Sequence, residues 1–117
     1  MKIFNYKFDD LEYDVIIGQK DTENWQIIKD SDEFDLWFHV DNLPSCHVVI
    51  RQNIKKGQQI NYVNQIITIA AEHCKEYSKY KDKKNKIIYT EIENLKLGKQ
   101  IGSVIINNDK LVHKISV

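Results

Sequence analysis

Two short apolar segments on either side of a five-residue turn constrain the fold of this chain more than any other feature. Residues 35–40 (DLWFHV) and 46–51 (CHVVIR) are rich in the β-branched and aromatic side chains that favour strands. The turn between them, Asp41-Asn42-Leu43-Pro44-Ser45, carries Asx and proline turn chemistry. The sequence therefore predicts an antiparallel hairpin over residues 35–51.

The register of this hairpin decides what each of its faces carries. If the strands pair about Leu43, residues whose numbers sum to 86 lie opposite each other. Successive side chains of a strand point to opposite faces, so one face is then apolar core. The other face holds Trp37, His39, His47, Val49 and Arg51. Rings that stack on bases, together with cationic or hydrogen-bonding groups, suit a nucleic acid. A slip of one residue would reverse the two faces.

Alternating or apolar patterns predict further strands at both ends of the chain. Residues 3–8 and 12–17 form a strand pair that turns at Asp9-Asp10. Near the C-terminal end the strand patterns cover residues 86–92, 103–107 and 111–117. The last two of these are expected to form a hairpin through Asn108-Asp109.

Two helices are expected between these strands. A short one covers residues 23–29, with Asp21 or Thr22 as its cap. A long one follows from an apolar stripe at spacings of three and four residues, with Asn61 as its N-cap; the stripe is Ile60, Val63, Ile67, Ala70, Cys74 and Tyr77. The expected fold is α+β, a mostly antiparallel sheet with one long helix and one short helix, in a single domain over residues 1–117.

The charge is neutral in total and polarised along the chain. Residues 1–41 carry 4 basic and 11 acidic side chains (4 − 11 = −7), and residues 42–117 carry 13 basic and 6 acidic ones (13 − 6 = +7). Exposed lysines of the basic part are candidate phosphate contacts: Lys55, Lys56, Lys79, Lys81, Lys83 and Lys84. The run around residues 79–86 has the ordinary interpretation of a solvated loop.

Cysteine usage and hydropathy predict the compartment. Cys46 and Cys74 show no CxxC spacing, so both are expected to be reduced thiols. No apolar run approaches the roughly 18 residues that would span a bilayer. The first ten residues lack the apolar segment of a signal peptide. We expect a cytoplasmic protein without a membrane partner.

Motifs of common enzyme classes are missing from the sequence. The four glycines form neither a GxGxxG motif nor a P-loop, and no GxSxG or HExxH occurs. A zinc site of His39, Cys46 and His47 is disfavoured, since adjacent strand residues point to opposite faces. Three alternatives stay open. In the first, Trp37 and the histidines are ordinary core residues. In the second, His39 and His47 act with Asp35 as acid and base on RNA, and in the third the chain binds a protein partner.

The hairpin residues resemble the NFACT-R domain, the RNA-binding module of the NFACT factors of ribosome-associated quality control. That family has the pattern D-[LI]-W-[FL]-H, a short loop with proline and small residues, then H-[VI] and an apolar strand, which residues 35–51 match. Further matches are Gly18, Asn24, Ala70-Ala71, Ser78, Tyr89-Thr90, Gly102 and Val104. The chain looks most like the stand-alone eukaryotic-type members, which continue into a charged coiled coil.

The resemblance implies an RNA-binding domain for tRNA or ribosomal RNA, with the ribosome or DNA as further candidate partners and with no cofactor or metal. The signature site would hold Asp35, Trp37, His39, Ser45, His47 and Arg51. The family's P-G-S-H loop is here Pro44-Ser45-Cys46-His47. Any close approach of a ligand to the loop backbone that needs the family's glycine is therefore not carried over to this chain. The tailing of stalled peptides belongs to regions that these 117 residues do not match.

Overall fold

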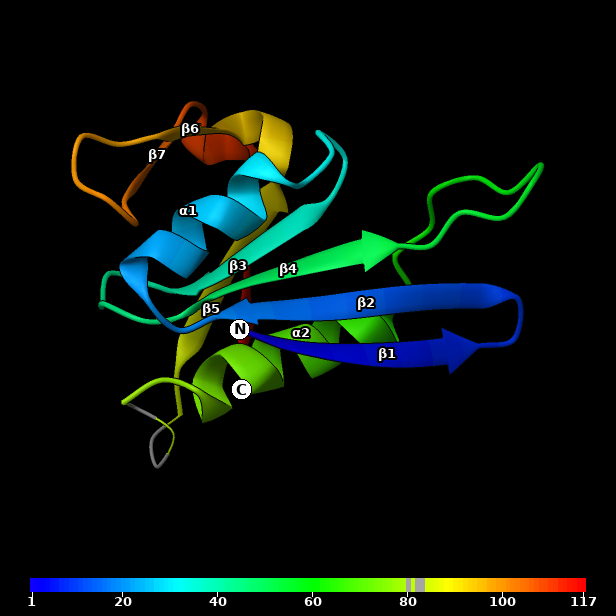
Figure 1. Cartoon of the computed structure of the whole chain (residues 1–117). Coiled ribbons are helices and arrows are strands. Elements are labelled where there is room, and N and C mark those ends of the chain that lie inside the picture. Colours follow the sequence, from blue (N-terminus) through cyan, green and yellow to red (C-terminus); the bar gives the residue numbers. More distant parts are fainter. Residues whose placement is uncertain (80, 82–83) are drawn as a thin grey trace.

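The computed structural model describes residues 1–79, 81 and 84–117. In this part of the chain two α-helices, α1 (Asp21–Lys29) and α2 (Asn64–Glu76), and two 3₁₀ turns, η1 (Ile92–Asn94) and η2 (Asp109–Leu111), accompany eight strands (Figure 1). The strands are β1 (Lys2–Phe8), β2 (Leu11–Gly18), β3 (Leu36–Val40), β4 (His47–Gln52), β5 (Lys86–Glu91), β6 (Leu95–Leu97), β7 (Val104–Ile106) and β8 (His113–Ser116). The α+β class is confirmed.

Six of the strands form one antiparallel sheet in the order β1-β2-β4-β3-β5-β8. The predicted hairpin is present, and its register is confirmed, because Phe38 lies opposite Val48 and Leu36 lies opposite Ile50. The N-terminal strand pair is confirmed as well: β1 and β2 turn at Asp9-Asp10, and Asp9 takes the left-handed φ of 54° that this tight connection needs.

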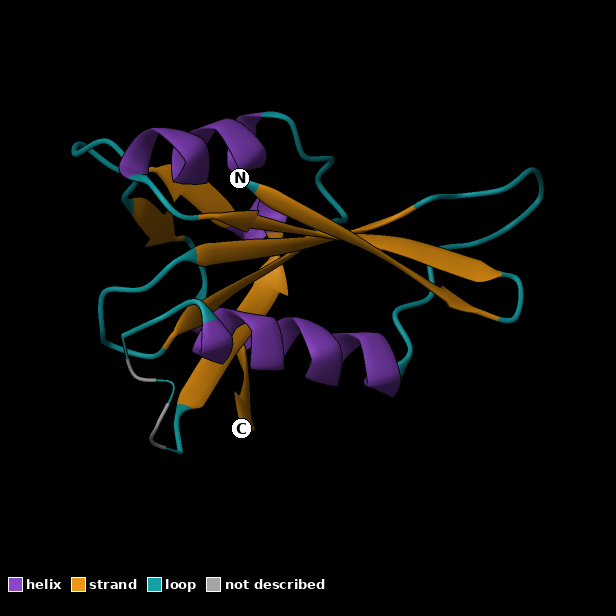
Figure 2. Ribbon diagram, turned by 60° about the horizontal axis from the view of Figure 1, so that its bottom comes forward, coloured by secondary structure: helices purple, strands orange, loops and turns teal. Residues whose placement is uncertain are grey.

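Helices cover both faces of the sheet. Figure 2 shows α1 on one side of the strands and α2 on the other. The larger core lies under α2, where Ala70, Ala71 and Cys74 are fully buried against strand residues such as Phe38. A smaller core lies under α1, around Trp37 and Val49. The prediction of an open nucleic-acid face on the Trp37 side is therefore wrong in one respect, since α1 packs on this face and forms a second core there.

The expected long helix is wrong. α2 has 13 residues and begins at Asn64, so it is only four residues longer than the nine-residue α1. The preceding residues stay extended because side chains of the sheet hold them. The Tyr13 hydroxyl donates to the Asn61 carbonyl, and the Asn61 N–H donates to Gln52 Oε1 at 2.7 Å. Asn61 therefore does not cap the helix, and Val63 at the cap position makes no side-chain cap bond.

The start of α1 also differs from the expectation. The helix begins at Asp21, so neither Asp21 nor Thr22 is its cap. The cap position falls on Lys20, which makes no side-chain cap bond. Instead the Glu23 carboxylate turns back and accepts a hydrogen bond from the backbone N–H of Gln19 at 3.0 Å. A carboxylate in the first turn is favoured there by the helix dipole.

The predicted C-terminal hairpin is wrong in its pairing. β7 pairs with β6, a strand that the sequence did not indicate, and β8 crosses to the edge of the main sheet beside β5. The Asn94 side chain explains this path: its Nδ2 donates to the Asn108 carbonyl at 3.0 Å, and its Oδ1 accepts from the Asn108 N–H at 2.9 Å. Residues 107–108 are thus tied to the end of η1, which directs β7 toward β6.

Candidate nucleic-acid interface

The first turn of α1 positions the start of β4. Gly18 lies opposite His47 in the β2–β4 pairing, and the Asn24 Oδ1 accepts from the His47 backbone N–H at 3.3 Å. A side chain on Gly18 would not fit, since its Cβ would lie 2.5 Å from Asn24 Oδ1. Gly18 and Asn24 therefore let α1 lie directly against the strand that carries His47.

Three rings lie together at the end of the hairpin, beside the β3–β4 turn. Trp37 and His39 stack with their centroids 5.5 Å apart and their planes at 18°. The His47 ring stands edge-on to both, at 77° to Trp37 and 86° to His39. Trp37 is 2% exposed and His47 is 4% exposed. The face of the indole is therefore covered by other residues and is not an open surface on which a base could stack.

Hydrogen bonds fix the tautomer of each histidine. The Trp37 Nε1–H can only donate, and it donates to His47 Nδ1 at 3.1 Å. The proton of neutral His47 is therefore on Nε2. The Val40 carbonyl can only accept, and it lies 2.7 Å from His39 Nδ1. The proton of His39 is therefore on Nδ1, and its Nε2 is an acceptor.

The histidines are uncharged at neutral pH. Burial, and to a lesser extent the neighbouring His39, lower the pKa of His47 to about 3. Burial also lowers the pKa of His39, although its hydrogen bond to Val40 and the charge of Asp41 act in the opposite direction. The pair consequently offers hydrogen bonds and not positive charge.

A cavity of about 450 Å³ opens beside the two imidazoles. Its walls come from β3, β4, β5, the 102–103 segment, β7 and the start of η2: Trp37, His39, His47, Ile88, Gly102, Ser103, Val104, Ile106 and Asp109. The 98–103 connection is held against α1, because the Trp25 Nε1–H donates to the Ser103 carbonyl at 2.8 Å. The site is thus bounded by the small β6–β7 unit.

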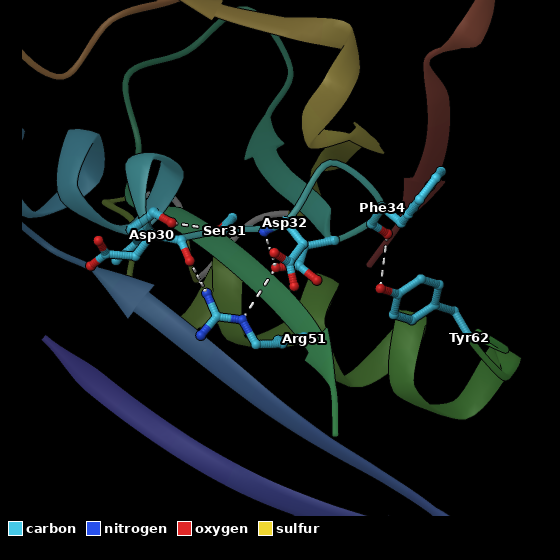
Figure 3. Close-up of polar contacts among 8 residues, drawn as sticks. Asp30, Ser31, Asp32, Phe34, Arg51 and Tyr62 are labelled. Carbon is cyan, nitrogen blue, oxygen red and sulfur yellow. Dashed lines mark hydrogen bonds and ion pairs between the residues drawn. The ribbon is translucent and has the colours of Figure 1, made fainter. Parts of the chain in front are cut away.

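Asp35 and Arg51 lie apart from the histidines and organise the turn before β3. The Arg51 Nε lies 3.2 Å from Asp35 Oδ2, and its Nη2 donates to the Asp30 carbonyl at 2.8 Å (Figure 3). Asp35 Oδ2 also accepts from the Asp32 N–H at 2.9 Å. Burial raises the pKa of Asp35 more than these hydrogen bonds lower it. Both signature residues are engaged within the protein.

Ser45 and Cys46 close the β3–β4 turn. The Ser45 hydroxyl accepts from the Val40 N–H at 3.1 Å and donates to the Cys46 carbonyl at 2.9 Å. Cys46 points away from His47 into the core under α2, where its Sγ lies 3.5 Å from the Cys74 carbonyl. Within the described residues no three His, Cys, Asp or Glu side chains come together to hold a metal.

The candidate lysines fall at two ends of the molecule. The described residues between α2 and β5 lie at the same end of the sheet as the β3–β4 turn, and the Asp41 N–H donates to the Lys86 carbonyl at 2.9 Å (Figure 1). Lys79, Lys81 and Lys84 are exposed there, whereas Lys83 lies outside the described residues. Lys55 and Lys56 are exposed in the 53–63 connection, which projects from the opposite end (Figures 1 and 2).

Sequence reasoning did not assign Asp109 or the β6–β7 unit to the site. One signal could have indicated a covered second face: β3 (LWFHV) and β4 (HVVIRQ) are apolar on both sides, a pattern typical of strands buried on two faces. Nothing in the sequence pattern places Asp109 in the cavity that the histidines line, since its position depends on how β7 is directed.

None of the helices in the described part of the chain is long and apolar enough to cross a membrane.

Comparison with known proteins gives the same fold and a family. A solved structure, the C-terminal part of the fibronectin/fibrinogen-binding protein from Streptococcus suis, superposes with a TM-score of 0.75 at 22% identity, covering 90% of this chain and 40% of that one. A likeness at this identity shows the shared fold.

Two curated relatives match at the level of sequence. The coiled-coil domain-containing protein 25 homolog of Dictyostelium discoideum is 32% identical over 118 residues, which covers 94% of this chain and 55% of that protein. Coiled-coil domain-containing protein 25 of Mus musculus is 28% identical over 110 residues, covering 90% of this chain and 52% of that protein. The chain spans about half the length of these relatives, which are of the stand-alone eukaryotic type.

The family model described as the NFACT protein RNA binding domain matches residues 2–108, nearly the whole chain. Its match includes the hairpin, the Gly18–Asn24 contact and the cavity up to β7. The chain therefore belongs to the NFACT-R family of RNA-binding domains.

Proposed function

We propose that this chain is a non-enzymatic RNA-binding module that contacts tRNA or ribosomal RNA in the cytoplasm, with the ribosome as the assembly where it meets that RNA. Membership of an RNA-binding domain family supports nucleic-acid binding as the general function. One observation supports an RNA-binding surface at this end of the sheet. The neutral histidine pair lies beside a cavity, and Lys79, Lys81 and Lys84 are exposed at the same end.

The RNA backbone would meet the lysines and the bases would meet the ring cluster. The described residues between α2 and β5 follow the helix on one side of the sheet, whereas the cavity is lined by Trp37 and Ile88 of the core under α1 on the other side. The β3–β4 turn lies at the same end of the sheet. A strand of RNA that passes around this turn can reach both. Phosphates then contribute the salt-dependent part of the affinity, and the cavity contributes contacts to bases.

The charge state of the histidines argues against an RNA-cleaving enzyme. General acid–base catalysis needs one group that gives a proton near neutral pH. His47, whose pKa is about 3, stays neutral there and keeps its Nδ1 lone pair occupied by the Trp37 N–H. Prolonged incubation with labelled tRNA should return the RNA intact, and turnover that His47→Gln abolishes would contradict the non-enzymatic proposal.

Fluorescence anisotropy with labelled tRNA and with a DNA duplex of equal charge tests the function. If three lysines contact phosphates, raising the salt fourfold should weaken tRNA binding by roughly 20- to 40-fold. Lys84→Gln should reduce the slope of log affinity against log salt by about 0.7 to 0.9. Lys7→Gln, an exposed lysine on β1, is the matched control and should leave the slope unchanged.

The Lys55→Gln/Lys56→Gln variant measures whether bound RNA also reaches the opposite end of the molecule. Salt-independent affinity, or equal effects of Lys84→Gln and Lys7→Gln, would contradict the proposed surface. Stronger binding to the DNA duplex than to tRNA would show that the domain prefers DNA and would contradict the RNA-binding proposal.

A further inference from the structure

The two histidines keep one ring nitrogen each for a ligand. Their Nδ1 atoms are engaged by the Trp37 indole and the Val40 carbonyl. Neither Nε2 has a hydrogen-bond partner among the described residues, and neither is among the fully buried unpaired atoms. The free nitrogens of His39 and His47 therefore reach the cavity that both residues line.

The polarity of these atoms is fixed. His47 presents an N–H donor, because its Nδ1 is the acceptor for Trp37. His39 presents its unprotonated Nε2 as an acceptor, because its proton is on Nδ1, which donates to the Val40 carbonyl. A third polar residue, Asp109, lines the same cavity, and its carboxylate makes no hydrogen bond or ion pair among the described residues. The two histidines and Asp109 thus supply one donor and two acceptor groups.

The same groups exclude a phosphate from the cavity. A phosphate oxygen needs donors or positive charge. The histidines stay neutral because burial lowers the pKa of both, and the Asp109 carboxylate would repel an anion. The remaining walls are the apolar side chains of Trp37, Ile88, Val104 and Ile106, together with Gly102 and Ser103, whose hydroxyl donates to the Gln100 carbonyl. An uncharged, flat, partly polar group fits these walls better than a phosphate does.

Resting on the proposed RNA-binding function, we propose that this cavity receives one unpaired base of the RNA and that guanine is the base it holds best. The hydrogen-bond donors and acceptors of guanine match those of the cavity. The Watson–Crick edge of guanine carries one acceptor, O6, and two donors, N1–H and the N2 amino group. Adenine offers one donor and one acceptor, and cytosine and uracil each offer one donor and two acceptors.

In the proposed complex the His47 Nε2–H donates to guanine O6, and the two guanine donors meet His39 Nε2 and Asp109. Any other base leaves at least one acceptor of the cavity without a donor, which costs affinity when the group is desolvated. Recognition of unstacked bases on their Watson–Crick edge is the usual way proteins read single-stranded RNA. At about 450 Å³ the cavity has room for a base.

Uridine hexanucleotides with guanine, inosine, adenine or cytosine at one central position test the proposal by ¹⁵N-resolved NMR titration. Guanine should bind about tenfold more tightly than adenine or cytosine, and the imidazole ¹⁵N signals of His39 and His47 should shift. Inosine lacks the N2 amino group and should bind a few-fold less tightly than guanine. Asp109→Ala should remove that guanine–inosine difference, because alanine has no acceptor for the N2 amino group, and it should leave the fold intact, because Asp109 is exposed. Lys110→Gln, at the neighbouring exposed position, is the control and should keep the difference.

The outcomes separate this inference from the proposed function. If tRNA binds with the expected salt dependence but the four hexanucleotides bind equally and move neither imidazole, the base site is wrong and the RNA-binding function stands. If inorganic phosphate shifts the imidazole signals as guanine-containing RNA does, the exclusion of phosphate is wrong. If neither tRNA nor any hexanucleotide binds, both proposals fall.

Discussion

The indole N–H of Trp37 donates to His47 Nδ1 at 3.1 Å, and this bond joins the two strands of the signature hairpin through their side chains. It explains why a tryptophan and a histidine occur together in the motif. The tryptophan is 2% exposed and sets the tautomer of the histidine beside it. The histidine then presents its other nitrogen to the cavity.

Trp37→Phe removes this donor while it keeps most of the apolar volume. We expect a loss of about 1 to 3 kcal/mol of folding stability, from the lost hydrogen bond and the smaller ring. The more specific result is in the imidazole ¹⁵N spectrum, where His47 should change from the pure Nε2–H tautomer to a mixture. An unchanged tautomer in Trp37→Phe would show that the indole does not control it.

The stability of the fold should decrease as the pH falls below the ordinary histidine range. The pKa of His47 is lowered from 6.5 to about 3 in the folded state, so between these values the unfolded chain binds more protons than the folded one. Stability therefore rises with pH across this window, by at most about 1.4 kcal/mol per pH unit for one site. Urea unfolding at several pH values checks this. His47→Gln should flatten the dependence, whereas His113→Gln, at an exposed position, should keep it.

Gly18→Ala should destabilise the protein by about 1 to 3 kcal/mol. The new Cβ would lie 2.5 Å from Asn24 Oδ1 and 3.2 Å from the Asn24 backbone N, so α1 must move away from β2. Gly57→Asn is the control, because Gly57 has a φ of 78°, which asparagine tolerates, and nothing lies within 4 Å of its Cβ position. Thermal unfolding of the two variants should separate them, and equal loss in both would contradict the close-packing argument.

Asp35→Asn tests the role of the Asp35–Arg51 pair in the turn before β3. We expect about 1 to 3 kcal/mol of destabilisation, since the substitution weakens the bonds to Arg51 Nε and to the Asp32 N–H. Hydrogen exchange should increase at residues 32–35, and tRNA affinity should change little. A large loss of RNA affinity with an unchanged turn would instead make Asp35 a direct contact.

Local patterns predicted much of the sheet and little of what covers its second face. Both N-terminal hairpins and the register of residues 36–50 follow from alternation and turn residues, which act over a few positions. The end of the extended segment at Val63 depends on hydrogen bonds from Tyr13 and Gln52, which lie far away in the sequence. The periodicity of the apolar stripe continues through this segment, and for that reason the helix was expected to be longer.

The candidate site shows the same limit. Trp37, His39 and His47 were found because they share one strand face. Asp109 lines the same cavity because the Asn94 side chain holds residue 108 and directs β7 toward β6. A long-range side-chain bridge of this kind leaves no periodic pattern in the sequence.

The most direct test of the account is the affinity of labelled tRNA for the wild type, Lys84→Gln and His39→Gln, each measured at two salt concentrations. We expect Lys84→Gln to weaken binding and to reduce its salt dependence, because this variant loses a phosphate contact. We expect His39→Gln to weaken binding with an unchanged salt slope, because this variant loses a base contact. Wild-type affinity in both variants would contradict an RNA surface at the β3–β4 end of the sheet.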